Sequence, residues 1–117
     1  MAIKNILESV RQTLFEAMSR DERVMILGED VGRHGGVFNA TQGLYEAFGE
    51  DRVVDTPLAE SSIVGIAIGA AVGGMLPIAE IQFADFIHPA VDQIINEAAK
   101  IRYRSNNDFG CPIVIRA

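Results

Sequence analysis

Residues 52–75 read RVVDTPLAESSIVGIAIGAAVGGM, and they combine the signals of a strand, a turn and a helix. The first residues predict a short strand, DTPLAE predicts a turn, and residues 62–74 predict an uncharged helix. Ser61 or Ser62 is a suitable helix cap, because its hydroxyl can accept a hydrogen bond from a free amide of the first turn. Glu60 is therefore expected at a helix start, where the positive end of the helix dipole favours a carboxylate.

Three glycines recur at four-residue intervals within the predicted helix: Gly65, Gly69 and Gly73. Each glycine costs about 1 kcal/mol of helix propensity relative to alanine. Close approach of another backbone would offset this cost, so the spacing predicts a helix face that packs tightly against a neighbouring segment. An acid in the first turn of a helix is also common without any catalytic role, and Glu60 alone is more typical of that structural role.

The composition is that of a globular domain, with 117 residues, 49% of them hydrophobic and 22% charged. The net charge of −6 argues against nucleic acid as a partner. A single cysteine, Cys111, excludes an internal disulfide and fits a reducing compartment. Residues 63–79 are uncharged but contain four glycines and Pro77, so we expect no membrane span. Residues 1–5 show no targeting segment, which predicts a cytoplasmic protein in a bacterium or a mitochondrial matrix protein in a eukaryote.

Apolar residues recur along the chain with alternating helical and strand-like patterns, which predicts an α/β fold: a parallel sheet flanked by helices. Residues 32–39 contain three glycines and predict a long loop. Pro89 fits the last helix only in its first turn. The sequence ends directly after a strand candidate, so we expect one domain over residues 1–117 that is incomplete at its carboxyl terminus. Helices are predicted at residues 4–19, 42–48, 62–74 and 87–101, and strands at residues 24–27, 52–55, 77–82 and 112–115.

Ligands of open parallel sheets bind at the carboxyl ends of the strands. On this rule the first strand delivers Glu29, the second delivers residues 58–60, and the third delivers Gln82, Phe83 and Phe86. Two carboxylates, an amide and two aromatic rings can hold a flat heterocycle with polar edges. Neither a basic residue nor a glycine-rich turn accompanies them in the sequence, so the set is unsuited to phosphate.

Motifs for other chemistries are missing from the sequence. It has no G-x-G-x-x-G turn after a strand, no G-x-x-x-x-G-K-[ST] loop and no G-x-S-x-G turn. His34 and His88 have no cysteine pair to accompany them, which argues against a structural zinc site. Each residue of the candidate set also has an ordinary structural role, so only the combination indicates a binding site.

Four segments cover nearly the whole chain and carry a family resemblance: LGEDVGRHGGVF (27–38), LYEAFGEDRVVDTPLAESSIVGIAIGAA (44–71), IAEIQFADFIHPAVDQIINEAAKIRYRS (78–105) and CPIVIRA (111–117). They resemble the amino-terminal part of the beta subunit of thiamine-diphosphate-dependent 2-oxo acid dehydrogenases. The resemblance implies the pyrimidine-binding, transketolase-like domain of the thiamine-diphosphate-binding fold. QFADF followed by IRYRS is most similar to the branched-chain enzymes, with pyruvate or acetoin dehydrogenases as the alternative.

The resemblance implies a role for each candidate residue. Glu60 matches the catalytic glutamate that bonds the aminopyrimidine nitrogen of thiamine diphosphate, and Phe86 matches an aromatic residue that stacks on this ring. Family members often have tyrosine at that position, so a phenolic hydrogen bond is lost here. Ile113 matches a residue whose backbone carbonyl lies near a structural potassium ion. The other implied cofactor neighbours are Glu29, Leu58, Ala59 and Gln82, and the implied substrate neighbours are Phe83, Ala84 and Asp85.

The resemblance also implies partners. In the family, a G-D-G…N motif of the alpha subunit holds the diphosphate and magnesium within an alpha2beta2 assembly, and a lipoyl acyltransferase receives the acyl group. That motif does not occur in this sequence, so the chain would hold half of a cofactor site. The family's catalytic histidine of the beta subunit lies beyond residue 117. The glycine-containing helix lies at a subunit interface in the family, so we expect the isolated chain to self-associate. The alternative from another class is a non-catalytic domain that serves only oligomer assembly.

Overall fold

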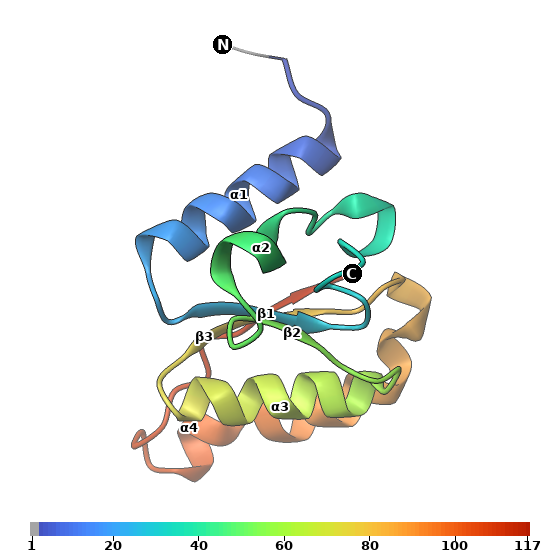
Figure 1. Ribbon diagram of the computed structural model, residues 1–117. Coiled ribbons are helices and arrows are strands. Elements are labelled where there is room, and N and C mark those ends of the chain that lie inside the picture. The colour runs from blue at the N-terminus through green and yellow to red at the C-terminus, as the bar shows by residue number, and fades with distance from the viewer. Residues whose placement is uncertain (1–2) are drawn as a thin grey trace.

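A four-stranded parallel sheet forms the centre of the molecule, and helices cover both of its faces (Figure 1). The structure is a computed structural model, and it describes residues 3–117. Every strand pairs in parallel with its neighbours, in the spatial order β2-β1-β3-β4. The predicted α/β class with a parallel sheet is therefore confirmed. The strands are β1 (Val24–Gly28), β2 (Val53–Asp55), β3 (Leu76–Glu80) and β4 (Val114–Arg116).

The sheet separates two hydrophobic cores. On one face lie α1 (Ile6–Arg20) and α2 (Leu44–Phe48), and on the other lies α3 (Glu60–Val72) (Figure 1). β1 is buried along its whole length because it runs between two other strands and under helices on both sides, which explains its continuous apolar sequence. The core on the α1 side includes Leu14, Met18, Val24, Ile26, Leu44 and Val53, and the core on the α3 side includes Met25, Leu27, Ile63, Val64, Ala67 and Ala79.

The predicted helix over residues 87–101 is not one continuous helix. A 3₁₀ segment, η2 (Ala84–Ala90), is followed by a π-helical segment, η3 (Gln93–Ala98), and then by the short helix α4 (Ile101–Arg104). Pro89 lies inside η2, and it has no amide proton to donate to a hydrogen bond within this helical segment. The prediction of a single helix that starts near residue 87 is therefore wrong. The helical segment begins earlier, at Ala84, and its hydrogen-bond pattern changes after the proline.

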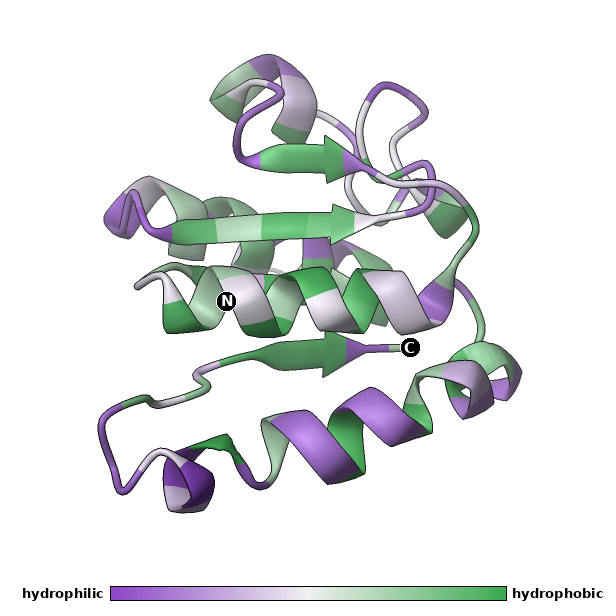
Figure 2. Ribbon diagram, turned by 90° about the horizontal axis from the view of Figure 1, so that it is seen from below, coloured by the Kyte–Doolittle hydropathy of each residue, from purple (hydrophilic) through white to green (hydrophobic). Residues whose placement is uncertain are grey.

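The start of α3 also differs from the sequence prediction. The helix begins at Glu60, and the cap residue Ala59 makes no side-chain hydrogen bond to the first turn. The prediction that Ser61 or Ser62 caps this helix is wrong, because both serines already lie inside the first turn. The expected place of Glu60 in the first turn is confirmed. The helix carries no other charged residue, and Figure 2 shows it mostly in the colours of apolar and small residues.

The glycines of α3 do not meet the backbone of another segment within residues 3–117. A Cβ atom at Gly65 would lie 3.4 Å from the side chain of Gln93, and one at Gly69 would meet nothing within 4 Å. At Gly73 the nearest atoms belong to α3 itself. The predicted tight backbone contact is therefore absent from the chain as described. The face that contains Gly69 is exposed, as is the neighbouring Ile66.

We expect the substitution Gly28→Ala to lower the free energy of unfolding by about 1–3 kcal/mol, as overpacking does in a well-packed core. Gly28 ends β1 and lies in register with Asp55 of β2 and Glu80 of β3. An added Cβ would lie 2.8 Å from the backbone oxygen of Glu80 and 3.0 Å from its Cβ, where a central strand has no room to move. Urea-induced unfolding of the chain measures the effect.

Gly69→Ala is the matched control for this prediction. It adds the same methyl group inside a helix where nothing lies within 4 Å, so we expect stability to rise by about 0.5–1 kcal/mol. A Gly28→Ala chain as stable as the unsubstituted one would contradict the proposed crowding.

In residues 3–117, no helix reaches the length and hydropathy that a membrane span requires.

Candidate functional site

The carboxyl ends of the strands meet at one edge of the sheet, and most of the predicted site residues lie there. Glu29 follows β1 directly, the segment 58–60 follows β2, and the segment 82–86 follows β3. The strands run in parallel, so their last residues stand in register across the sheet (Figure 1). We call this edge the carboxyl edge. From one side of the sheet to the other, the residues in register are Asp55, Gly28, Glu80 and Arg116.

The first turn of α3 holds the candidate acid at this edge. Glu60 is half-buried and lies at the positive end of the helix dipole. Leu58, two residues before it, is 69% exposed, and Ala59 is the cap residue of the helix. α3 also packs against η2, so the acid and the aromatic residues that follow β3 belong to the same region. The arrangement places one carboxyl group at the same edge of the sheet as the exposed side chain of Leu58.

Three phenylalanine rings lie together at the carboxyl edge, and we call Phe38, Phe83 and Phe86 the aromatic cluster. The ring centroids of Phe83 and Phe86 are 6.1 Å apart with an interplanar angle of 87°. Those of Phe38 and Phe83 are 6.5 Å apart with an angle of 85°. Both contacts are edge-to-face, which is a favourable aromatic geometry. All three rings are exposed to solvent, so the cluster offers apolar ring surface to a ligand.

Sequence reasoning did not select Phe38. The residue belongs to the predicted loop over residues 32–39, which folds into a turn and the short 3₁₀ segment η1 (Val37–Asn39). The sequence signal for it was weak: a phenylalanine two residues after the glycine pair 35–36, in a segment predicted to be a loop. The segment over residues 82–86, in contrast, was selected correctly as lying at the carboxyl edge.

A second group that sequence reasoning missed is the ion pair between Glu80 and Arg116. The Glu80 side chain is fully buried, and Arg116 Nη1 lies 2.6 Å from its Oε2 atom. Neither carboxylate oxygen accepts a well-directed hydrogen bond from residues 3–117. Burial raises the pKa of Glu80 above its ordinary value, and the charge and contact of Arg116 partly offset this shift. The pair joins the ends of β3 and β4, and the signal for it was an acid inside an apolar strand.

Ile113 lies apart from these residues. It precedes β4, so it is at the amino edge of the sheet, opposite Glu60 and the aromatic cluster. Among residues 3–117 there is no group of three or more histidine, cysteine, aspartate or glutamate side chains that could hold a metal ion.

The basic residues near the carboxyl edge are engaged with other side chains. The guanidinium of Arg33 lies 5.5 Å from the ring centroid of Tyr45, and His34 Nδ1 lies 3.4 Å from a carboxylate oxygen of Asp30. Glu60 offers a carboxyl group and the aromatic cluster offers ring faces, which are the two kinds of group expected for a flat heterocycle with polar edges. Glu60 and the aromatic cluster contain no cation of their own, and the expectation of half a cofactor site stays a prediction.

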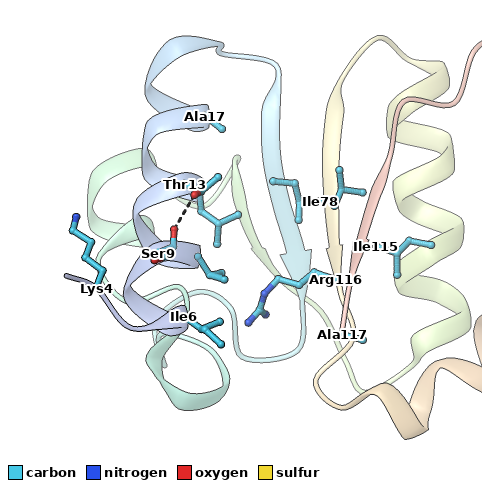
Figure 3. Close-up of a pocket in the computed structure, with 12 residues that line it drawn as sticks. Lys4, Ile6, Ser9, Thr13, Ala17, Ile78, Ile115, Arg116 and Ala117 are labelled. Carbon is cyan, nitrogen blue, oxygen red and sulfur yellow. Dashed lines mark hydrogen bonds between the residues drawn. The ribbon is translucent and has the colours of Figure 1, made fainter. Parts of the chain in front are cut away.

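A groove of about 810 Å³ lies between α1 and β4 (Figure 3). Apolar side chains line it, among them Val10 and Leu14 of α1, Ile78 of β3 and Val114 of β4. The lining contains neither a carboxylate nor an aromatic ring, so it does not share the chemistry of the carboxyl edge. Arg116 reaches into this groove from β4 (Figure 3).

The fold is an α/β domain whose parallel strands end at one shared edge, the place where open parallel sheets bind their ligands. Residues 4–117 match the family described as "Transketolase, pyrimidine binding domain", and the chain belongs to this family. The predicted pyrimidine-binding domain is thus confirmed as a family assignment.

Comparison with individual relatives makes this assignment more specific. The chain is 67% identical over 117 residues to the 2-oxoisovalerate dehydrogenase subunit beta of Bacillus subtilis, covering 100% of the chain and 36% of that protein. It is 47% identical over 111 residues to the 3-methyl-2-oxobutanoate dehydrogenase subunit beta of Mycobacterium tuberculosis, covering 95% of the chain and 32% of that protein. It is 49% identical over 116 residues to the pyruvate dehydrogenase E1 component subunit beta of Acholeplasma laidlawii, covering 99% of the chain and 36% of that protein.

These comparisons confirm the predicted resemblance to beta subunits of 2-oxo acid dehydrogenases. The Bacillus subtilis relative, of the branched-chain type, shares more identity with the chain than the pyruvate relative does, as QFADF and IRYRS predicted. The chain spans 36% of the length of the Bacillus subtilis protein.

Proposed function

We propose that the chain is the pyrimidine-binding part of the beta subunit of a branched-chain 2-oxo acid dehydrogenase. Such an enzyme is an oxidoreductase that decarboxylates a branched-chain 2-oxo acid and transfers the acyl group to a lipoyl group. The observation that carries the proposal is the 67% identity to a 2-oxoisovalerate dehydrogenase beta subunit across the whole chain. A pyruvate or acetoin dehydrogenase is the second candidate, and the 49% identity to a pyruvate dehydrogenase subunit favours it over other classes.

The proposed cofactor is thiamine diphosphate, which when bound supplies a nucleophilic carbon for the decarboxylation. Glu60 would hold and exchange a proton through a carboxylate oxygen at the pyrimidine nitrogen, and its place in the first turn of α3 supports this role. Phe86 would pack its exposed ring against the pyrimidine face, supported by its edge-to-face contact with Phe83. The remaining proposed neighbours of the ring are Glu29, Leu58, Ala59 and Gln82.

Two further assignments of the proposal concern substrate and metal. Phe83, Ala84 and Asp85 are exposed beside Phe86, which supports their role as neighbours of the substrate. Ile113 would offer its backbone carbonyl to a potassium ion at the amino edge, where such an ion would stabilise structure and take no part in the chemistry. Magnesium would come with the diphosphate through the alpha subunit, because the family's G-D-G…N motif for both groups does not occur in this sequence.

The proposed partners are an alpha subunit, in an alpha2beta2 assembly, and a lipoyl acyltransferase. The exposed face of α3 with Ile66 and Gly69 supports a protein contact there, because exposed apolar and small residues allow close packing. We propose no nucleic acid partner and no membrane contact. A bacterial protein of this kind would work in the cytoplasm, and a eukaryotic one in the mitochondrial matrix.

Steady-state rates of the assembled alpha–beta complex on 2-oxoisovalerate and on pyruvate test the proposal. We expect a higher kcat/KM for 2-oxoisovalerate. A clear preference for pyruvate would favour the second candidate. No turnover of either acid by a folded complex with thiamine diphosphate and magnesium would contradict both, and would favour a non-catalytic assembly domain.

The isolated chain is expected to bind thiamine diphosphate weakly or not at all, and to self-associate. The diphosphate carries charge that needs a cation and donors, while the chain has a net charge of −6. The exposed face of α3 and the apolar groove beside β4 both favour association of copies. Calorimetry with the cofactor and magnesium, together with light scattering, measures both properties. Micromolar binding by a clean monomer would overturn this prediction.

A further inference from the structure

Phe38 is held in an unusual position that the proposed function has not used. Its side chain is 75% exposed, and its backbone has a φ of 53°, in the left-handed region. Bulky residues rarely adopt this conformation, because the Cβ atom crowds the backbone. The conformation therefore needs support from the surrounding structure.

The loop that carries Phe38 is fastened at three places. The amide of Gly32 donates to Asp55 Oδ1 at 2.6 Å, which ties the loop to the end of β2. The buried hydroxyl of Thr41 donates to the backbone oxygen of Val31 at 2.7 Å. Arg11 Nε donates to the backbone oxygen of Asn39 at 2.9 Å, which ties the loop to α1. The framework of the domain therefore sets where the ring of Phe38 lies, although the ring itself is exposed.

Phe83 occupies the middle of the aromatic cluster. It makes one edge-to-face contact with Phe38 and one with Phe86, at centroid distances of 6.5 and 6.1 Å. Phe83 is itself 45% exposed and Phe86 is 52% exposed, so the contacts between the rings restrict how far each of them can turn. When a ring becomes ordered only as the ligand binds, the loss of its conformational entropy lowers the affinity. A ring that the protein already holds in place adds no such cost.

We propose that Phe38 is a positioning residue that orders Phe83, and through Phe83 orders Phe86, for stacking against a pyrimidine ring. This inference rests on the proposed function, because it takes the pyrimidine of thiamine diphosphate as the ligand of the cluster. Phe38 acts through another side chain and carries out no chemistry. Loss of its contact is expected to weaken cofactor binding without changing how Glu60 exchanges its proton.

The test is the Kd of thiamine diphosphate for the assembled alpha–beta complex, measured by calorimetry in the presence of magnesium. Phe38→Ala is expected to raise the Kd by about 2- to 10-fold, the range that corresponds to one aromatic pair. Phe38→Tyr keeps the edge-to-face contact and should bind as the unsubstituted complex does. Phe38→Leu keeps an apolar side chain without a ring, and should bind as weakly as Phe38→Ala. Phe109→Ala is the matched control, because Phe109 is 49% exposed but lies before β4, at the amino edge.

A double-mutant cycle identifies the route by which Phe38 acts. With Phe83→Leu already present, Phe38→Ala should change the Kd by less than about 2-fold, since the intermediate ring has been removed. An unchanged Kd in the single Phe38→Ala complex would overturn the inference, as would an undiminished effect of Phe38→Ala alongside Phe83→Leu. If the unsubstituted complex itself fails to bind the cofactor, the proposed function is contradicted instead, so the two failures are distinguishable.

Discussion

Replacing Glu60 with glutamine is expected to lower the kcat of the assembled alpha–beta complex by at least about 100-fold, the lower end of what acid–base catalysis contributes. The carboxamide keeps the size and shape of the side chain, but it cannot give and take a proton at the pyrimidine nitrogen. Glu60 is half-buried in the first turn of α3, so the substitution should leave the fold intact. Steady-state turnover of 2-oxoisovalerate measures the effect, and circular dichroism checks the fold.

Glu46→Gln is the matched control for Glu60→Gln. Glu46 is also an acid in the first turn of a helix, α2, but it is exposed and α2 covers the opposite face of the sheet from α3 (Figure 1). Both substitutions remove a similar favourable interaction with a helix dipole, about 0.3–1 kcal/mol of stability. Only Glu60→Gln should reduce turnover. Full turnover by a folded Glu60→Gln complex would support the domain as a non-catalytic assembly element.

Replacing Arg116 with methionine is expected to lower the free energy of unfolding by about 3–5 kcal/mol at pH 8. The substitution leaves the Glu80 carboxylate fully buried without the cation that lies 2.6 Å from it. An unpaired buried charge is strongly destabilising, because the desolvation cost of the carboxylate is no longer offset by its partner. Urea-induced unfolding of the chain, followed by far-ultraviolet circular dichroism, measures the change.

The effect of Arg116→Met should depend on pH in a defined direction. Burial raises the pKa of Glu80 in the folded chain, so the folded state binds a proton more readily than the unfolded state. The Glu80 contribution to stability is therefore most favourable below the ordinary pKa of a glutamate, and it decreases as the pH rises through the folded pKa. Removal of Arg116 raises the folded pKa further, so the loss at pH 5 should be smaller than at pH 8. An equal loss at both values would contradict this assignment.

A double variant separates the ion pair from simple packing. Glu80→Leu with Arg116→Met replaces both charges by apolar groups, which is often neutral or stabilising for a buried pair. We expect the double variant to recover most of the stability that Arg116→Met loses. If it is as unstable as the single variant, packing around β4 and not the unpaired charge accounts for the loss.

Much of the architecture followed from local patterns in the sequence. The continuous apolar run at residues 24–27 and the mainly apolar stretch at residues 77–82 predicted the strands that the structure places at β1 and β3, because strands covered on both faces need mostly apolar side chains. Alternation with helices predicted parallel pairing. Parallel pairing in turn placed Glu29, Glu60 and Phe86 at one edge before any contact was known.

Local patterns were less informative where several hydrogen-bonding arrangements compete. Ser61 and Ser62 are good caps, yet the helix starts before both of them, at Glu60. The apolar periodicity after β3 identified residues that pack against the core, Ile94, Ala98 and Ile101, but these are only half-buried and Ile95 is exposed. The periodicity did not show the change from 3₁₀ to π-helical geometry around Pro89. A helical segment can present the same apolar face with either 3₁₀, α or π hydrogen bonds. In this structure the segment packs against α3, and that packing favours one of these hydrogen-bond patterns.

Residue types and periods along the chain were sufficient for the fold class, the shared edge and the acid at the start of α3, because these depend on interactions within a few residues. The contact between Phe38 and Phe83 depends instead on how a fastened loop crosses the end of the sheet. The pairing of Glu80 with Arg116 depends on the register of β3 against β4. A slip of one residue in that register would turn Arg116 to the other face, and nothing local to either strand encodes the choice.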